Sequence, residues 1–176
     1  MKTNIVILRG INVSGKNILP MAELRDLLNG LKFENVQTYI QSGNVVLNSV
    51  LSKEEVAEKV KKRIASKFGY DVPVLVRTIS EWENAIANNP YPTENHKIVS
   101  FTFLSEVSKE ATIEVNITND DEYTIVDDMV YVYCPDGFGR TKLTNNIFEK
   151  KLNITATSRN YRTTMRLLEM AKNNNN

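Results

Sequence analysis

The chain has 176 residues, 41% of them hydrophobic, and its 22 basic side chains nearly balance 21 acidic ones. This length and apolar content allow a substantial buried core and exclude global disorder. A net charge of +1 gives no long-range field that would attract DNA or an anionic membrane, so an anion site must be local. The single Cys134 excludes an internal disulfide, and the single His96 excludes a His-rich zinc site.

The first half of the chain predicts a strand, a helix, a hairpin, a second helix and a closing strand. Pro20 suits the first turn of a helix, and Ser52 with Glu55 forms a capping-box pattern for the second helix. Pro73 cannot donate to a ladder, so the closing strand is expected at a sheet edge. We expect strands at 4–9, 36–41, 45–47 and 72–76, and helices at 20–30 and 52–68.

The same order of elements is predicted again after a connector that contains a short helix and several prolines. The repeat lies in the order of elements and not in the residues themselves. A last helix at 160–171 follows, and the asparagine tail is expected to be mobile or ordered only by a neighbour. We expect strands at 98–104, 123–126, 129–133 and 154–157, and helices at 108–115 and 144–152.

This order of strand, helix, hairpin, helix and strand is the signature of the split βαβ motif. The predicted fold class is therefore α+β, with two tandem ferredoxin-like (βαββαβ) subdomains, mainly antiparallel sheets and a C-terminal helix. The expected divisions are an N-terminal subdomain at 1–79, a connector at 80–96, a C-terminal subdomain at 97–172 and a tail at 173–176.

The loop at residues 10–17 nearly matches the Walker phosphate-binding pattern. Asn17 replaces the hydroxyl that would hold magnesium, and the following helix is expected only at Pro20, so we reject a nucleoside triphosphatase site. A softer hypothesis is an anion-binding nest of backbone N–H groups flanked by Arg9 and Lys16. The alternative is an ordinary glycine turn with a solvated lysine.

Four segments resemble a known protein family across nearly the whole chain. They are LRGINV at 8–13, YIQSGNVV at 39–46, GRTKLTN at 139–145 and KLNITATSRNY at 151–161. The chain resembles the bacterial family of uncharacterised proteins called DUF1697. The resemblance implies a two-subdomain α+β fold with ferredoxin-like halves, and it implies no established activity.

Cationic residues recur around two loops of the second half. The loop with Arg140 and Lys142 lies between a strand and a helix, so its donors would lie near that helix's N-terminus, where an anion is favoured. Arg159 precedes the last helix and is expected to point outward as a second wall of the same site, whereas the alternative is that the short polar residues around it only cap the helix.

A nucleic-acid hypothesis rests on aromatic and polar groups. Tyr131 and Tyr133 share a face of a predicted strand and could stack bases, or they could cover the inner side of the sheet. The amide and hydroxyl groups at the hairpin tip (Gln41, Ser42 and Asn44) could bind a base or a sugar, although turn chemistry alone also explains them. The basic run at 59–67 is interpreted as a solvated helix face.

The working hypothesis is a cytoplasmic protein that binds a small phosphorylated or nucleotide-like anion. Alternatives are an RNA or single-strand binder and a dimerisation module; no membrane, metal or cofactor is expected, and the sequence predicts no reaction type. The aspartates at 120–128 are explained by turns. The candidate ligand-binding residues are Arg9, Gly10, Asn12, Gly15, Lys16, Gln41, Ser42, Asn44, Arg140, Lys142, Arg159 and Asn160.

Overall fold

A computed structural model describes residues 1–117 and 119–174 of the chain. Two compact units are present: Met1–Asn84 with the last helix from Arg166 onward, and Ala85–Met165. Compactness alone does not show which segment folds independently, so the domain limits expected from the sequence stay predictions. In the described part of the chain, no helix is both long and apolar enough to cross a membrane.

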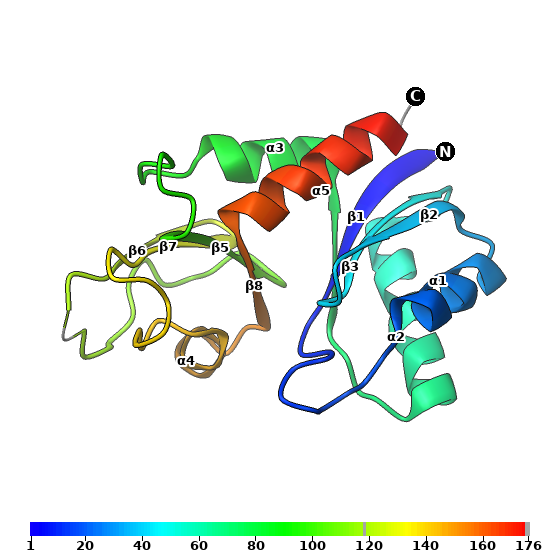
Figure 1. Ribbon diagram of the computed structural model, residues 1–176, viewed down its shortest axis with the longest axis horizontal. Helices are drawn as coiled ribbons and strands as arrows, with labels where there is room; N and C mark the ends of the chain where they lie inside the picture. Colours follow the sequence, from blue (N-terminus) through cyan, green and yellow to red (C-terminus); the bar gives the residue numbers. More distant parts are fainter. Residues whose placement is uncertain (118, 175–176) are drawn as a thin grey trace. The chain divides into compact units, whose positions relative to one another are not determined.

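The first unit is built on a four-stranded antiparallel sheet of order β2-β3-β1-β4. Helices α1 and α2 cover one of its faces (Figure 1), where alternate residues such as Val6, Leu8 and Val45 are buried. The edge position of β4, next to Pro73, is as predicted. The elements are β1 (Lys2–Leu8), α1 (Met21–Gly30), β2 (Glu34–Tyr39), β3 (Asn44–Ser49), α2 (Lys53–Phe68), β4 (Val74–Thr78) and α3 (Ile79–Ala87).

The caps of α2 follow directly from the sequence. The Ser52 side chain accepts a hydrogen bond from the Glu55 N–H, and the Glu55 carboxylate accepts one from the Ser52 N–H. Gly69 ends the helix in the left-handed conformation with φ 73°. Each of these contacts satisfies a backbone group that a helix end otherwise leaves without a partner.

The second unit repeats the strand order of the first, as β6-β7-β5-β8 with every pairing antiparallel. The predicted fold class is thereby confirmed. Helix α4 lies against one face of this sheet (Figure 1). The elements are β5 (Val99–Leu104), β6 (Glu122–Val126), β7 (Met129–Tyr133), α4 (Asn145–Leu152), β8 (Ala156–Asn160) and α5 (Tyr161–Asn174).

The helix expected at 108–115 does not form, and the described residues between β5 and β6 are irregular. Ile113, Val115 and Ile117 pack against the core cluster beside β5. Their spacing of two residues suits an extended chain and not a helical stripe. The hydroxyl of Tyr123 fixes this loop, because it accepts from the Ile113 N–H at 2.8 Å and donates to the Ile113 carbonyl at 3.0 Å.

The asparagine tail was expected to be mobile or ordered only by a neighbour, and α5 continues through Asn174. The Asn174 side chain is buried within the first unit, where its amide donates to the Asn35 carbonyl and to Asn48 Oδ1, both at 3.1 Å. Its own Oδ1 accepts from Gln37 Nε2 at 2.8 Å. Polar contacts to β2 and β3 therefore replace the apolar anchor that the sequence lacks. Residues 175–176 lie outside the described part.

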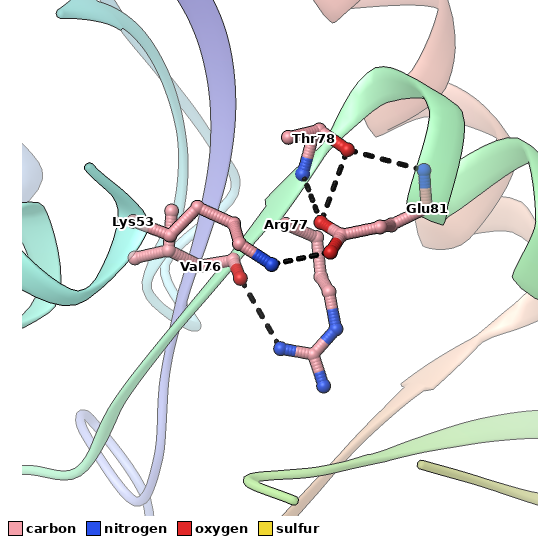
Figure 2. A network of polar contacts seen from close by, with 5 residues as sticks. All are labelled: Lys53, Val76, Arg77, Thr78 and Glu81. Atoms are coloured by element: carbon pink, nitrogen blue, oxygen red, sulfur yellow. Dashed lines mark hydrogen bonds and ion pairs between the residues drawn. The ribbon is translucent and has the colours of Figure 1, made fainter. Parts of the chain in front are cut away.

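A polar network joins β4, α2 and α3 in the first unit (Figure 2). The Thr78 hydroxyl accepts from the Glu81 N–H at 3.2 Å, and the Glu81 carboxylate accepts from the Thr78 N–H at 2.8 Å. Glu81 also pairs with Lys53 of α2. Lys53 and the Thr78 hydrogen bonds lower the pKa of the Glu81 carboxyl although partial burial opposes the shift. The network fixes where α3 begins.

Tyr131 lies in the core of the second unit with no exposed surface. Its hydroxyl donates to the Ala85 carbonyl at 2.7 Å, and its ring meets the Phe101 ring edge to face. Tyr133 is stacked against Tyr91, with ring centroids 5.3 Å apart. Tyr131 is therefore buried and cannot stack a base, whereas Tyr133 is half-buried and stacks on Tyr91; the nucleic-acid hypothesis itself stays a prediction.

Substitution of Gly43 tests how closely the hairpin turn packs against β1. Its φ is +74°, and an added Cβ would lie 2.7 Å from Leu8 Cβ and 2.8 Å from Ile11 Cδ1. We expect Gly43→Ala to lower the free energy of unfolding by about 3 kcal/mol, because left-handed strain adds to overpacking. Gly69→Ala is the matched control: its φ is +73° with open space around it, and about 1 kcal/mol is expected. Equal losses in urea unfolding would contradict the packing argument.

The raised pKa of the buried Tyr131 hydroxyl predicts that the protein loses stability at alkaline pH. Burial, aided by the charges of Asp128 and Asp127, raises its pKa to about 12, above the value of about 10 for an unfolded chain. The folded state therefore holds this proton more tightly than the unfolded state does. The contribution of the neutral Tyr131 hydroxyl to the free energy of unfolding is present below pH ~10 and is lost as pH rises through ~12. The stability difference between the wild type and Tyr131→Phe should shrink from pH 8 to pH 11 in urea unfolding. An unchanged difference would contradict the shift.

Candidate functional site

A polar pocket of about 320 Å³ lies within the second unit, beside the start of α4. Most of the side chains that line it carry hydroxyl or amide groups, three are apolar, and none of them is charged. The lining residues are Ser100, Thr102, Val132, Phe138, Thr141, Leu143, Thr144, Asn145, Ser158 and Asn160.

The register of β5 and β8 explains why polar groups collect here. Thr102 pairs with Ser158 and Ser100 pairs with Asn160, so these four side chains lie on one face of the sheet. Leu104 and Ala156, which pair two positions further along, belong to the core beneath α4. The apolar core thus gives way to a polar surface along the same two strands, and the pocket opens at that change.

A chain of short hydrogen bonds orders the pocket wall. The Ser158 hydroxyl donates to Asn145 Oδ1 at 2.6 Å. Because Ser158 has only one proton, the Thr102 hydroxyl at 2.6 Å must be the donor to Ser158. The Asn145 oxygen is therefore occupied, and among the described residues its Nδ2 amide group has no partner.

Asn160 is oriented in the same sense. Its Oδ1 accepts from the Thr163 N–H at 2.8 Å and so caps α5, while its Nδ2 group has no partner in the described part of the chain. The Thr144 hydroxyl likewise accepts from the Ile147 N–H at 3.4 Å as the cap of α4. The pocket therefore presents the Nδ2 donors of Asn145 and Asn160 beside the hydroxyl oxygens of Ser100, Thr102 and Ser158, whose protons are already donated.

Thr141 connects the pocket to a buried thiol and a buried carboxylate. Burial raises the pKa of the Cys134 thiol to about 11, and neighbouring Asp121 acts in the same direction. Such a thiol is un-ionised at neutral pH and is a poor nucleophile. The Asp121 side chain is 5% exposed, and its oxygens receive no N–H or O–H donor from the described residues. Nothing in this cluster provides an activated nucleophile for the pocket.

The glycine loop of the first unit forms a closed hairpin. Val13 and Lys16 pair across Ser14 (φ 50°) and Gly15 (φ 74°), a turn with two positive φ values. The Lys16 N–H donates to Val13 and the Asn12 N–H donates to Asn17, so the loop itself uses two of the N–H groups that a nest would offer. The Lys16 side chain is exposed.

Asparagine side chains of this loop and of the hairpin tip use their donors on backbone carbonyls. Asn12 Nδ2 donates to Leu19 at 2.9 Å and to Gln41 at 2.7 Å, and Asn17 Nδ2 donates to Gly10 at 3.0 Å. Asn44 is fully buried and donates to the Tyr39 carbonyl and to Ser42 Oγ. These contacts hold the turns together, as the alternative of plain turn chemistry predicts. Arg9 is half-buried beside them, and its N–H donates to the Pro73 carbonyl.

The cationic candidates of the second unit are only partly brought together. Arg140 and Lys142 are exposed on either side of Thr141, whose side chain lines the pocket. Arg159, which was expected to point outward, is 8% exposed and donates to Thr157 and to the Ser158 carbonyl. It pairs with Phe101, so it lies on the sheet face opposite the pocket. It does not form a second wall with Arg140.

Arg77 is the counterpart of Arg159 in the first unit, and the sequence analysis missed it. Each arginine directly precedes the residue that caps the following helix, Thr78 for α3 and Asn160 for α5. Each is 8% exposed and donates Nη1 to the carbonyl of the residue before it. The spacing of arginine, cap and helix start was the sequence signal that could have shown this repeat.

The sequence analysis also missed most of the pocket. Asn160 lines it and was named, but Thr102, Asn145 and Ser158 were not. They are single polar residues in separate elements without a motif, and their pairing depends on strand register. Among the described residues, no three His, Cys, Asp or Glu side chains gather into a group that could hold a metal ion.

Comparisons with known proteins support the fold and the family. A solved structure, that of conserved bacterial protein SP0830 from Streptococcus pneumoniae, matches with a TM-score of 0.71 and 22% identity, and it covers 97% of this chain and 98% of that one. No curated protein matches in sequence. The family model described as "Protein of unknown function (DUF1697)" matches residues 1–131, which include β5 but not α4 or β8. The family resemblance is thereby confirmed, and the chain belongs to the DUF1697 family.

Proposed function

We propose that the second unit binds a small phosphorylated ligand in the polar pocket. The observation that carries this proposal is the orientation of Asn145 and Asn160, whose oxygens each accept a hydrogen bond and whose Nδ2 donors have no partner among the described residues. A phosphate group has only acceptor oxygens at its periphery when it is ionised, so the two amide donors are complementary to it.

The position of the pocket adds electrostatic support. It includes Thr144 and Asn145, the cap and first residue of α4, where the helix dipole favours an anion. Arg140 and Lys142 are exposed in the adjoining loop, on either side of Thr141, and add positive charge near the pocket. This proposal keeps Arg140, Lys142 and Asn160 from the sequence analysis as ligand-binding residues.

The other expectations about partners are less well supported by the geometry. A stacking platform for nucleic acid would need exposed rings, but Tyr131 is buried and Tyr133 is stacked on Tyr91. A dimer interface would need a large apolar surface, whereas the described pocket is polar and concave. A cytoplasmic location is proposed because the buried Cys134 is a free thiol.

Replacement of Asn145 by aspartate tests the donor wall with little change of shape. Asn145→Asp keeps an oxygen that accepts from Ser158, but it removes two donors and adds a negative charge. We expect affinity for inorganic phosphate, measured by isothermal titration calorimetry, to fall by more than about tenfold. The matched control is Asn146→Asp, which places the same charge on the next, exposed residue of α4; a fall of at most about threefold is expected from its charge alone.

Two results would contradict the proposal. The first is an absence of phosphate binding by the wild-type protein at millimolar concentration. The second is an equal loss of affinity in the two variants, because general charge repulsion and not the pocket would then explain the effect.

A further inference from the structure

A second depression of about 380 Å³ adjoins the start of α4 in the same unit. The loop between β5 and β6 contributes Val115 and Glu114 to it, and α4 contributes Ile147 and Lys151. Its walls combine aliphatic side chains with the long methylene stems of lysines, so its interior is mainly apolar. The polar pocket, in contrast, is lined by hydroxyls and amides.

The two depressions are neighbours around one residue. Thr144, the cap of α4, lines both of them. Thr141 and Leu143 face the polar pocket, and Lys142, which lies between them in sequence, lines the apolar depression. A single ligand that contacts the N-terminus of α4 can therefore place one end in each depression.

The irregular loop is what makes the second depression available. In the first unit the segment between the first two strands forms α1, which packs on the sheet. In the second unit the equivalent described residues form an extended loop that contacts the core through Ile113, Val115 and Ile117. An extended chain covers less of a sheet than a helix does, and space remains beside Ile147.

The apolar lining of the second depression, more than its charges, suits it to the ring end of a ligand, because Lys142 and Lys151 outnumber Glu114 there. Glu114 lines the apolar depression, and a carboxylate there disfavours a dianionic phosphate. Lys142 and Lys151 also line it, and ammonium groups make favourable contacts with the face of an aromatic ring. The amide donors of Asn145 and Asn160 suit a phosphate in the first pocket, and the aliphatic lining beside the two lysines suits an uncharged ring in the second depression.

We propose that the ligand is an aryl phosphate monoester, with its phosphate at Asn145 and its uncharged ring between Val115 and Ile147. This inference rests on the proposed function, because it uses the same anion pocket. It adds a second binding subsite and a class of ligand to it. Ring burial between aliphatic side chains supplies affinity that inorganic phosphate cannot gain.

Titration of the wild-type protein with inorganic phosphate and with phenyl phosphate distinguishes the proposed phosphate pocket from the proposed aryl subsite. We expect phenyl phosphate to bind at least about tenfold more tightly, as measured by isothermal titration calorimetry. In the same protein, the methyl resonances of Ile147 should shift on addition of phenyl phosphate and stay in place with inorganic phosphate. This second measurement requires no variant and so does not depend on the folding of one.

Ile147→Ser removes the apolar wall without touching the polar pocket. We expect this variant to lose most of the gain from the ring, about fivefold or more, while its affinity for inorganic phosphate is unchanged. The matched control is Ile154→Ser, since Ile154 packs against the core and lines neither depression. It should keep the full gain.

The outcomes distinguish the two proposals. Equal affinity for both compounds, or a gain that survives Ile147→Ser, would overturn the aryl subsite and leave phosphate binding intact. Failure of both compounds to bind would overturn the proposed function and the subsite together.

Discussion

The hydroxyl of Ser158 holds together the part of the molecule on which the functional account depends. It lies 2.6 Å from Thr102 Oγ1 of β5 and donates to Asn145 Oδ1 at 2.6 Å, so it joins β5, β8 and the first turn of α4. This contact fixes the orientation of the Asn145 amide, because its oxygen faces Ser158 and its Nδ2 donors face away from that hydroxyl. The same rule applies to Asn160, whose oxygen caps α5. The preference for an anion thus follows from bonds that also stabilise the fold.

The two units share one strand order but differ in the surface that covers the sheet. In the first unit, α1 and α2 cover the sheet, and the amides of Asn12, Asn17 and Asn44 use their donors on backbone carbonyls. In the second unit, α4 faces a loop that does not continue as a helix, and the described pockets open on either side of Thr144. The two units therefore differ in the segment that covers the sheet. They also differ in whether the asparagine Nδ2 group or the asparagine oxygen makes the hydrogen bond within the protein.

The sequence predicts the elements well where local rules determine them. Ser52, Glu55 and Gly69 define both ends of α2, and Pro73 correctly indicates an edge strand. The prediction is wrong at 108–115. A helix was expected there, although the apolar residues alternate with a period of two, which is typical of an extended chain. The expectation that Arg159 points outward is also wrong. Strand β8 begins at Ala156, and its register places the Arg159 side chain on the face opposite α4. Hydrogen-bond direction in the pocket depends on contacts between distant segments, which no local pattern encodes.

The most direct measurement is a phosphate titration followed by nuclear magnetic resonance of the asparagine side-chain amides. Each Nδ2 group gives its own pair of signals, so donors that are free and donors that are already bonded can be compared in one sample. The account predicts that the Asn145 and Asn160 signals shift together with a single affinity, and that those of Asn12 and Asn44 do not move. Shifts confined to Asn12 and the Lys16 loop, with Asn145 and Asn160 unchanged, would contradict it.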